Sequence, residues 1–213
     1  MSESVAAGGS SPEIVTEGSG WVERTADRAE LVVVFDARGR SRAAAVEDLG
    51  RRVARAREAL DLPGLTVQSR RLAVHTEYRS SKPSGCRASE SFQIRVDDIG
   101  QLERALSLFL GAEPASVSGP SWSLAEPEAV FAQAQERAVA DARRRAQGYA
   151  AALGGTLGPL RRLSEAPEHG GVPMMAMRSA RAEGGPDVAE LGLEPEAVRV
   201  TARCTTTWSL TQG

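Results

Sequence analysis

The stretch "PEAVFAQAQERAVADARRRAQGYAAALGG", residues 127–155, decides the fold of this 213-residue chain. Pro127 suits the first turn of a helix, and Glu126 and Glu128 suit the positive end of the helix dipole. Gly154 and Gly155 are typical of a helix end. The stretch therefore predicts one continuous helix over 127–153, about 40 Å long.

One stripe of this helix consists mostly of small side chains that recur every three or four residues. Its members are Phe131, Ala134, Ala138, Ala142, Ala146, Tyr149 and Leu153. Small side chains let a helix backbone approach its neighbour closely, so the stripe predicts a helix pressed onto a β-sheet. The arginines at 137 and 143–145 share the helix with Glu136 and Asp141, which predicts a face in water.

The segments around this helix alternate between strand and helix patterns. Strands are predicted at 13–23, 28–37, 65–78, 86–96, 115–124, 156–164 and 198–210, and helices at 41–60 and 98–111. Residues 31–124 follow the βαββαβ order of the ferredoxin-like arrangement. The sequence predicts an α+β fold: this core, extended by the long helix and C-terminal strands, gives an antiparallel-rich sheet with helices packed on one face.

Local patterns refine these strands. The apolar run 31–35 predicts a strand buried on both faces, and a change of apolar parity predicts a bulge near 69–71. "SSKPSG" at 80–85 predicts a turn, and Pro120 predicts an edge or bulged strand. One domain is expected over 13–213, with a flexible tail at 1–12 and a mobile loop at about 165–196.

Composition argues against several classes of protein. A formal net charge of −2 gives no overall attraction to nucleic acid, and no aromatic side chains interleave with the arginines. No run reaches the roughly 20 apolar residues of a membrane span. The N-terminus lacks the pattern of a secretory signal, which predicts a cytoplasmic protein. Cys86 and Cys204 lack the spacing of a zinc site or a disulfide framework.

Residues that could carry chemistry are few. His75 and His169 are isolated, and "GGTLG" at 154–158 follows a helix, whereas a phosphate-binding loop precedes one. The sequence therefore predicts no catalytic residues, no cofactor and no metal site.

Two binding hypotheses remain open. Met174, Met175 and Met177 could ligate copper(I) or form a partner-binding surface, or they could belong to an unstructured loop. A small-molecule or metal-binding pocket between the sheet and the mobile loop is the second hypothesis. Its lining would be Tyr78, Trp122 and Trp208, whose alternative role is core packing.

Several segments together resemble the SIMPL-domain family over nearly the whole folded chain. The chain is similar to the family pattern "GxGxV....PDxA" at Gly18, Gly20, Val22, Asp27 and Ala29. "GCRAS" at 85–89 resembles a family hairpin strand, although Cys86 replaces the usual aromatic residue and Ala26 the usual proline. The most specific likeness is the spacing of Ala138, Asp141, Ala142, Ala146, Leu153, Gly154 and Gly158.

This resemblance implies a non-enzymatic protein. Bacterial members of the family include periplasmic immunogenic and oxidative-stress-associated proteins, and animal members bind a receptor-associated kinase. The resemblance implies self-assembly into rings or channel-like oligomers and brings no catalytic residues. The leading hypothesis is a cytoplasmic homo-oligomeric scaffold or interaction module, possessing no nucleic-acid partner, with a role in stress response and a protein partner that is unknown.

Overall fold

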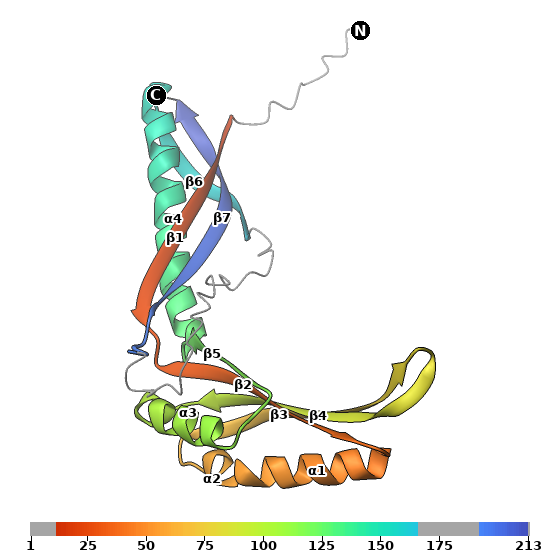
Figure 1. Cartoon of the computed structure of the whole chain (residues 1–213). Coiled ribbons are helices and arrows are strands. Elements are labelled where there is room, and N and C mark those ends of the chain that lie inside the picture. The colour runs from red at the N-terminus through yellow and green to blue at the C-terminus, as the bar shows by residue number, and fades with distance from the viewer. Residues whose placement is uncertain (1–11, 166–191, 213) are drawn as a thin grey trace. The chain divides into compact units, whose positions relative to one another are not determined.

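The computed structural model describes residues 12–165 and 192–212, which form two compact units, each with its own sheet (Figure 1). The α4 unit consists mainly of β1 (Glu13–Thr25), α4 (Pro127–Ala152), β6 (Gly155–Glu165) and β7 (Ala197–Gln212). The β2–β5 unit contains β2 (Arg28–Gly39), α1 (Arg42–Arg55), α2 (Arg57–Leu60), β3 (Leu65–Arg79), β4 (Lys82–Val96), the 3-10 helix η1 (Ile99–Gln101), α3 (Leu102–Gly111) and β5 (Ser116–Ser123).

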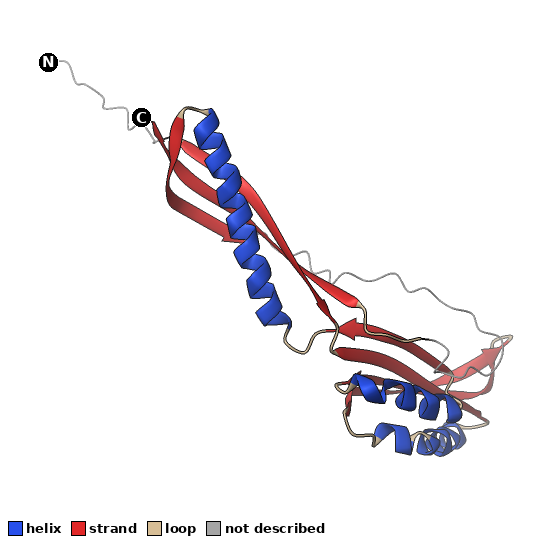
Figure 2. Ribbon diagram, turned by 90° about the vertical axis from the view of Figure 1, so that its left-hand side faces the viewer, coloured by secondary structure: helices blue, strands red, loops and turns tan. Residues whose placement is uncertain are grey.

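The sheet of the β2–β5 unit has the strand order β3-β4-β2-β5, and each neighbouring pair is antiparallel. Helices α1 and α2 lie between β2 and β3 in the chain, and α3 lies between β4 and β5. This order and these directions are compatible with the predicted ferredoxin-like core. Figure 2 shows the helices of this unit on one face of its sheet, which confirms the predicted α+β layering.

Large side chains fill the core between that face and the helices. The rings of Phe35 on β2 and Phe92 on β4 meet edge to face, with centroids 6.1 Å apart. Leu49 of α1 and Phe109 of α3 cover them and are almost completely buried. Ser41 caps α1, because its hydroxyl accepts a hydrogen bond from the Ala44 N–H at 3.2 Å.

The strands of this unit confirm some local predictions and correct others. A register shift between Val67 and Ser69 gives the bulge that was predicted. β5 is an edge strand, as Pro120 predicted. The prediction that residues 31–35 are buried on both faces was wrong. Val32 and Val34 are half-buried, because the helices cover only the opposite face of the sheet. The predicted turn at 80–85 is shorter, since β4 already begins at Lys82.

The α4 unit contains a second sheet, with strand order β1-β7-β6. The C-terminal strands therefore form a separate sheet with β1, on which the long helix packs, and they add no strand to the β2–β5 sheet. Figure 2 shows α4 as one unbroken helix along a face of this second sheet. The single helix predicted over 127–153 is confirmed, because α4 runs from Pro127 to Ala152.

The buried row of α4 differs from the predicted stripe at its ends. Tyr149 and Leu153 are 61% and 65% exposed, and Phe131 is half-buried. The buried row consists of Val130, Ala134, Ala138, Asp141, Ala142, Ala146 and Ala150. Apart from Asp141, the row follows steps of four residues, whereas the predicted stripe took a step of three from Phe131 to Ala134 and another from Ala146 to Tyr149.

The predicted tail at 1–12 and the predicted loop at 165–196 lie almost entirely outside the described residues, and so do His169 and the three loop methionines. The single domain predicted for 13–213 stays a prediction. Within the described residues, none of the helices has the length and apolar character needed to cross a membrane.

Candidate functional site

The first feature of the candidate site is an unusually close approach of β1 to α4. Gly18 and Gly20 lie directly on the helix backbone. A Cβ atom added at Gly18 would lie 2.0 Å from the Ala138 carbonyl oxygen, and one added at Gly20 would lie 2.2 Å from the Ala134 carbonyl oxygen. Real Cβ atoms do not approach other atoms so closely, so only glycine fits at these two positions. This contact, together with Thr16, Ser19, Asp141, Ala142 and Thr206, is called the β1–α4 seam below.

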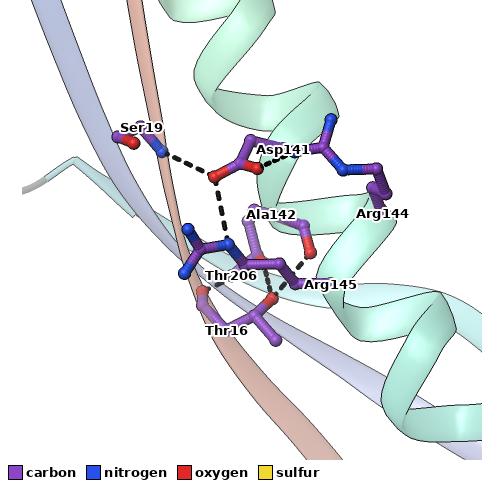
Figure 3. A network of polar contacts seen from close by, with 7 residues as sticks. All are labelled: Thr16, Ser19, Asp141, Ala142, Arg144, Arg145 and Thr206. Atoms are coloured by element: carbon purple, nitrogen blue, oxygen red, sulfur yellow. Dashed lines mark hydrogen bonds and ion pairs between the residues drawn. The ribbon is translucent and has the colours of Figure 1, made fainter.

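Asp141 is the charged group of this seam and is only 8% exposed (Figure 3). Its Oδ2 atom accepts a hydrogen bond from the Ser19 backbone N–H at 3.2 Å and lies 3.2 Å from the Nε atom of Arg145. Its Oδ1 atom pairs with Arg144. The Ser19 N–H lowers the pKa of Asp141 below its ordinary value, burial opposes this, and the two arginines lower the pKa further. Asp141 is therefore an ionised anchor, with each oxygen engaged.

A chain of hydroxyl groups continues the seam into the sheet. The Thr16 hydroxyl donates to the Ala142 carbonyl at 2.9 Å and lies 3.1 Å from the Thr206 hydroxyl. Because the one proton of Thr16 goes to Ala142, Thr206 is the donor toward Thr16, where its hydroxyl reaches both the Thr16 hydroxyl and, at 3.3 Å, the Thr16 carbonyl oxygen. Thr206 in turn accepts a hydrogen bond from the Trp208 indole N–H at 2.9 Å. These bonds tie β1, α4 and β7 together.

Cys204 is buried beside this network. Burial raises the pKa of its thiol, a hydrogen bond from the Gly18 backbone N–H opposes this effect, and the charge of Asp141 raises the pKa further. A thiol with a raised pKa stays protonated at neutral pH and is a poor nucleophile. The polar groups of the seam are therefore suited to a structural role, because each carboxylate oxygen of Asp141 has a donor and the Cys204 thiol is protonated.

One further side chain of α4 reaches β1. Arg137 donates a hydrogen bond from Nη1 to the Trp21 carbonyl oxygen at 2.6 Å. On β7, the Arg199 guanidinium lies 4.5 Å from the centroid of the Trp21 ring and forms an ion pair of 2.7 Å with Glu23. Arg137, one of the arginines predicted to face water, thus binds the backbone of the edge strand β1.

The structure brings most of the family-like residues together in the seam. Gly18, Gly20, Ala138, Asp141, Ala142 and Ala146 all lie where β1 meets α4. Asp27 belongs to the other unit, where its Oδ1 atom accepts a hydrogen bond from the Ala125 N–H at 2.6 Å. Gly154 has a φ of +71° just after α4, and Gly158 packs against Ser209 of β7.

The aromatic residues of the predicted pocket do not share a core. Trp208 packs on the Ile14 cluster of the α4 unit, and Trp122 packs on the core of the β2–β5 unit. Tyr78 is exposed in the β3–β4 hairpin. In residues 12–165 and 192–212, no group of three or more His, Cys, Asp or Glu side chains is placed to hold a metal ion.

Sequence reasoning missed Thr16, Ser19 and Thr206. Thr16 and Ser19 lie in a segment where only the glycine spacing attracted notice, and Thr206 is one of three consecutive threonines on β7. The sequence carried no clear signal for Asp141, because it lies beside the alanine row and shares its own row with Arg137 and Arg145. A carboxylate in such a row is normally predicted to face water.

The fold and the seam define a class of α+β protein. In this class a long helix packs on a sheet and is held to the edge strand by close backbone approach and by one carboxylate. A protein-family model described as "SIMPL: Protein of unknown function (DUF541)" matches residues 14–208. The chain therefore belongs to the SIMPL family.

A curated relative is similar over 70% of the chain. It is the uncharacterized protein YggE of Edwardsiella ictaluri (strain 93-146), which is 27% identical over 157 residues. The match covers 70% of this chain and 66% of the relative's length. The family resemblance seen in the sequence is thus confirmed, and the residues matched by the family model include both units.

Proposed function

We propose that this SIMPL protein is a non-enzymatic, homo-oligomeric scaffold or protein-interaction module. The observation that carries the proposal is apolar surface on both edge strands of the α4 unit. β1 exposes Val15 and Trp21, and β6 exposes Leu160 and Leu163. Strand edges with exposed apolar side chains are sites where a sheet pairs with another chain.

The buried polar groups of the seam support the non-enzymatic part of the proposal. Asp141 is held ionised by three donors, and Cys204 is held protonated, so neither is poised for acid–base or nucleophilic work. Both groups instead stabilise the position of α4 on β1. The proposed compartment is the cytoplasm and the proposed context is stress response, which fractionation of cells before and after oxidant treatment would test.

Light scattering coupled to size exclusion tests the assembly. The full chain should show a mass that is a whole-number multiple of the monomer mass and constant across the micromolar range. A monomer throughout that range would contradict the proposal. The alternative, a small-molecule or metal-binding protein, depends on a loop that lies outside the described residues, and it stays a prediction.

A further inference from the structure

The edge of β1 that faces away from β7 is covered by α4 side chains along only part of its length. In a strand, the N–H and C=O of one residue point to the same side, and those of the next residue point to the other side. Leu210 of β7 donates to the Pro12 carbonyl at 2.8 Å, so even-numbered residues of β1 face β7. Odd-numbered residues face the open edge, where Asp141 binds the Ser19 N–H and Arg137 binds the Trp21 carbonyl.

The same edge is open at residues 13–17. Within the described part of the chain, β1 has β7 as its only neighbouring strand, and no backbone partner is found for Glu13, Val15 or Glu17 on the open side. The Glu13 and Glu17 side chains are exposed and form no ion pair with described residues, and Val15 is 60% exposed. This part of the edge has the backbone groups that another strand needs.

The helix changes character beside this open segment. Arg137 and Asp141 belong to a row of α4 residues spaced by four, which continues through Arg145 to Tyr149 and Leu153. Ile14 of β1 packs on Ala146 and Ala150, so the end of this row lies near residues 13–15. Where α4 side chains cover the edge of β1, this row of α4 is polar. Where the edge is open, the row is apolar and ends in the exposed Tyr149 and Leu153.

The opposite edge strand, β6, carries complementary side chains. Leu160 and Leu163 pair with Trp208 and Thr206, whose side chains lie on the α4 side of the sheet, so both leucines lie on that side. Arg162 pairs with Thr207 and lies on the outer face, and Arg161 is the extra residue of a register shift. Glu13 and Glu17 alternate with the buried Ile14 and Thr16, so they also lie on the outer face.

These charges distinguish between the possible pairings of two copies. An in-register β1–β1 pair, in either direction, places glutamates beside glutamates, and a β6–β6 pair places arginines beside arginines. Like charges on neighbouring strands destabilise a sheet. A β1–β6 pair instead places Glu13 and Glu17 beside Arg162 on the outer face. On the α4 side it places Leu160 and Leu163 beside Tyr149 and Leu153.

We propose that residues 13–17 of one copy pair edge to edge with residues 160–163 of a second copy, so that the two three-stranded sheets become continuous. The inference rests on the proposed homo-oligomer and names its interface. Because the two contacting surfaces differ, the interface is heterologous, and an open assembly has a free β1 edge at one end and a free β6 edge at the other until a ring closes. Pro159 lacks an N–H and ends the pairing surface on β6.

Charge reversal tests this interface. The double variants E13R/E17R and R161E/R162E should each raise the dissociation constant of assembly at least tenfold, measured by light scattering. The quadruple variant, with both edges reversed in one chain, should assemble like the wild type. An equimolar mixture of the two double variants should also assemble, because each variant carries one sign of charge on both edges and the copies can alternate.

The control is E103R/E136R, which reverses two exposed glutamates that lie on α3 and α4 and belong to neither edge strand. Circular dichroism should be unchanged in all variants, since the altered side chains are exposed. The thermal midpoint should be unchanged at a concentration where all variants are monomeric, because assembly itself stabilises the folded state. An oligomeric wild type whose mass is unaffected by E13R/E17R would overturn the interface and leave the proposed function standing. Failure of both the quadruple variant and the mixture to assemble would overturn the charge pairing, and a monomeric wild type would overturn both proposals.

Discussion

Both units of this protein pack helices on a sheet, but they do so with side chains of opposite size. In the β2–β5 unit, Phe35, Phe92 and Phe109 fill the space between the layers. In the α4 unit, Gly18 and Gly20 bring the strand onto the helix backbone, and alanines face them. The first unit is held by apolar volume, and the second is held by close backbone approach and buried hydrogen bonds.

This difference predicts opposite sensitivities to mutation. A core filled by large side chains loses stability when a side chain becomes smaller, because a cavity remains. A seam between backbones loses stability when a side chain becomes larger, because nothing can move aside without separating the layers. The predictions below test this contrast, and each has a control residue on a neighbouring or equivalent surface.

The largest effect is expected in the β2–β5 unit. Phe92→Ala should lower the free energy of unfolding by about 3–5 kcal/mol, because the ring contacts Phe35 and is almost fully buried. Chemical denaturation followed by circular dichroism measures the change. Ser91→Ala, one residue away on the face without helices, should stay within about 0.5 kcal/mol. Equal effects of the two substitutions would contradict a volume-filled core.

The matching test in the α4 unit adds one methyl group. Gly18→Ala should cost about 3 kcal/mol, because the new Cβ atom would lie 2.0 Å from a backbone oxygen and the helix would have to move away. Ser19→Ala is the control, since its side chain points away from α4 and its N–H remains for Asp141. Hydrogen exchange should show faster exchange in α4 for the glycine variant alone. Unchanged protection of α4 in Gly18→Ala would contradict a seam held by close backbone approach.

How much of this could be read from the sequence depends on the range of the interactions. The limits of α4 follow from local signals at Pro127 and Gly154, and the βαββαβ order follows from local periodicity. The second sheet is a long-range pairing of β1 with β7, and nothing within residues 13–25 indicates that partner. The family resemblance did identify Gly18 and Gly20, but their shared role on the helix backbone needs the fold.

Side-chain placement shows the same limit. Tyr149 and Leu153 were predicted to be buried because apolar residues at helical spacing usually are, yet the buried row continues through Ala150. Burial of Asp141 was outside the reach of periodicity, since a carboxylate is normally predicted to face water. Its burial depends on the Ser19 N–H, a backbone group that no sequence pattern reveals.

The charge in the seam should make the α4 unit sensitive to acid. The folded state lowers the pKa of Asp141 below its ordinary value of 3.8, so its contribution is present above that value and is lost as the pH falls through the folded pKa. Asp141→Asn should therefore cost about 2 kcal/mol at pH 7, the range for hydrogen bonds to a charged group. The difference from the wild type should shrink as the pH falls below about 4.

Chemical denaturation at a series of pH values from 7 to 3 measures this difference. Glu136→Gln is the control, because Glu136 is exposed on the same helix and has no ion pair with described residues. It should show no comparable gap at pH 7. A gap for Asp141→Asn that stays constant down to pH 3 would mean that shape, and not charge, holds the seam.

The smallest loss of stability is expected when a hydroxyl group of the seam is removed. Thr206→Val keeps the shape of a side chain that is 0% exposed but removes the acceptor for Trp208 and the donor for Thr16. The expected cost is about 1 kcal/mol, with a shift in tryptophan emission as the Trp208 indole loses its partner. Thr201→Val, exposed on the same strand, should change stability by less than about 0.5 kcal/mol. If Thr206→Val were as stable as the wild type, the seam would depend on apolar contact alone, and the contrast with the β2–β5 unit would be reduced to side-chain size.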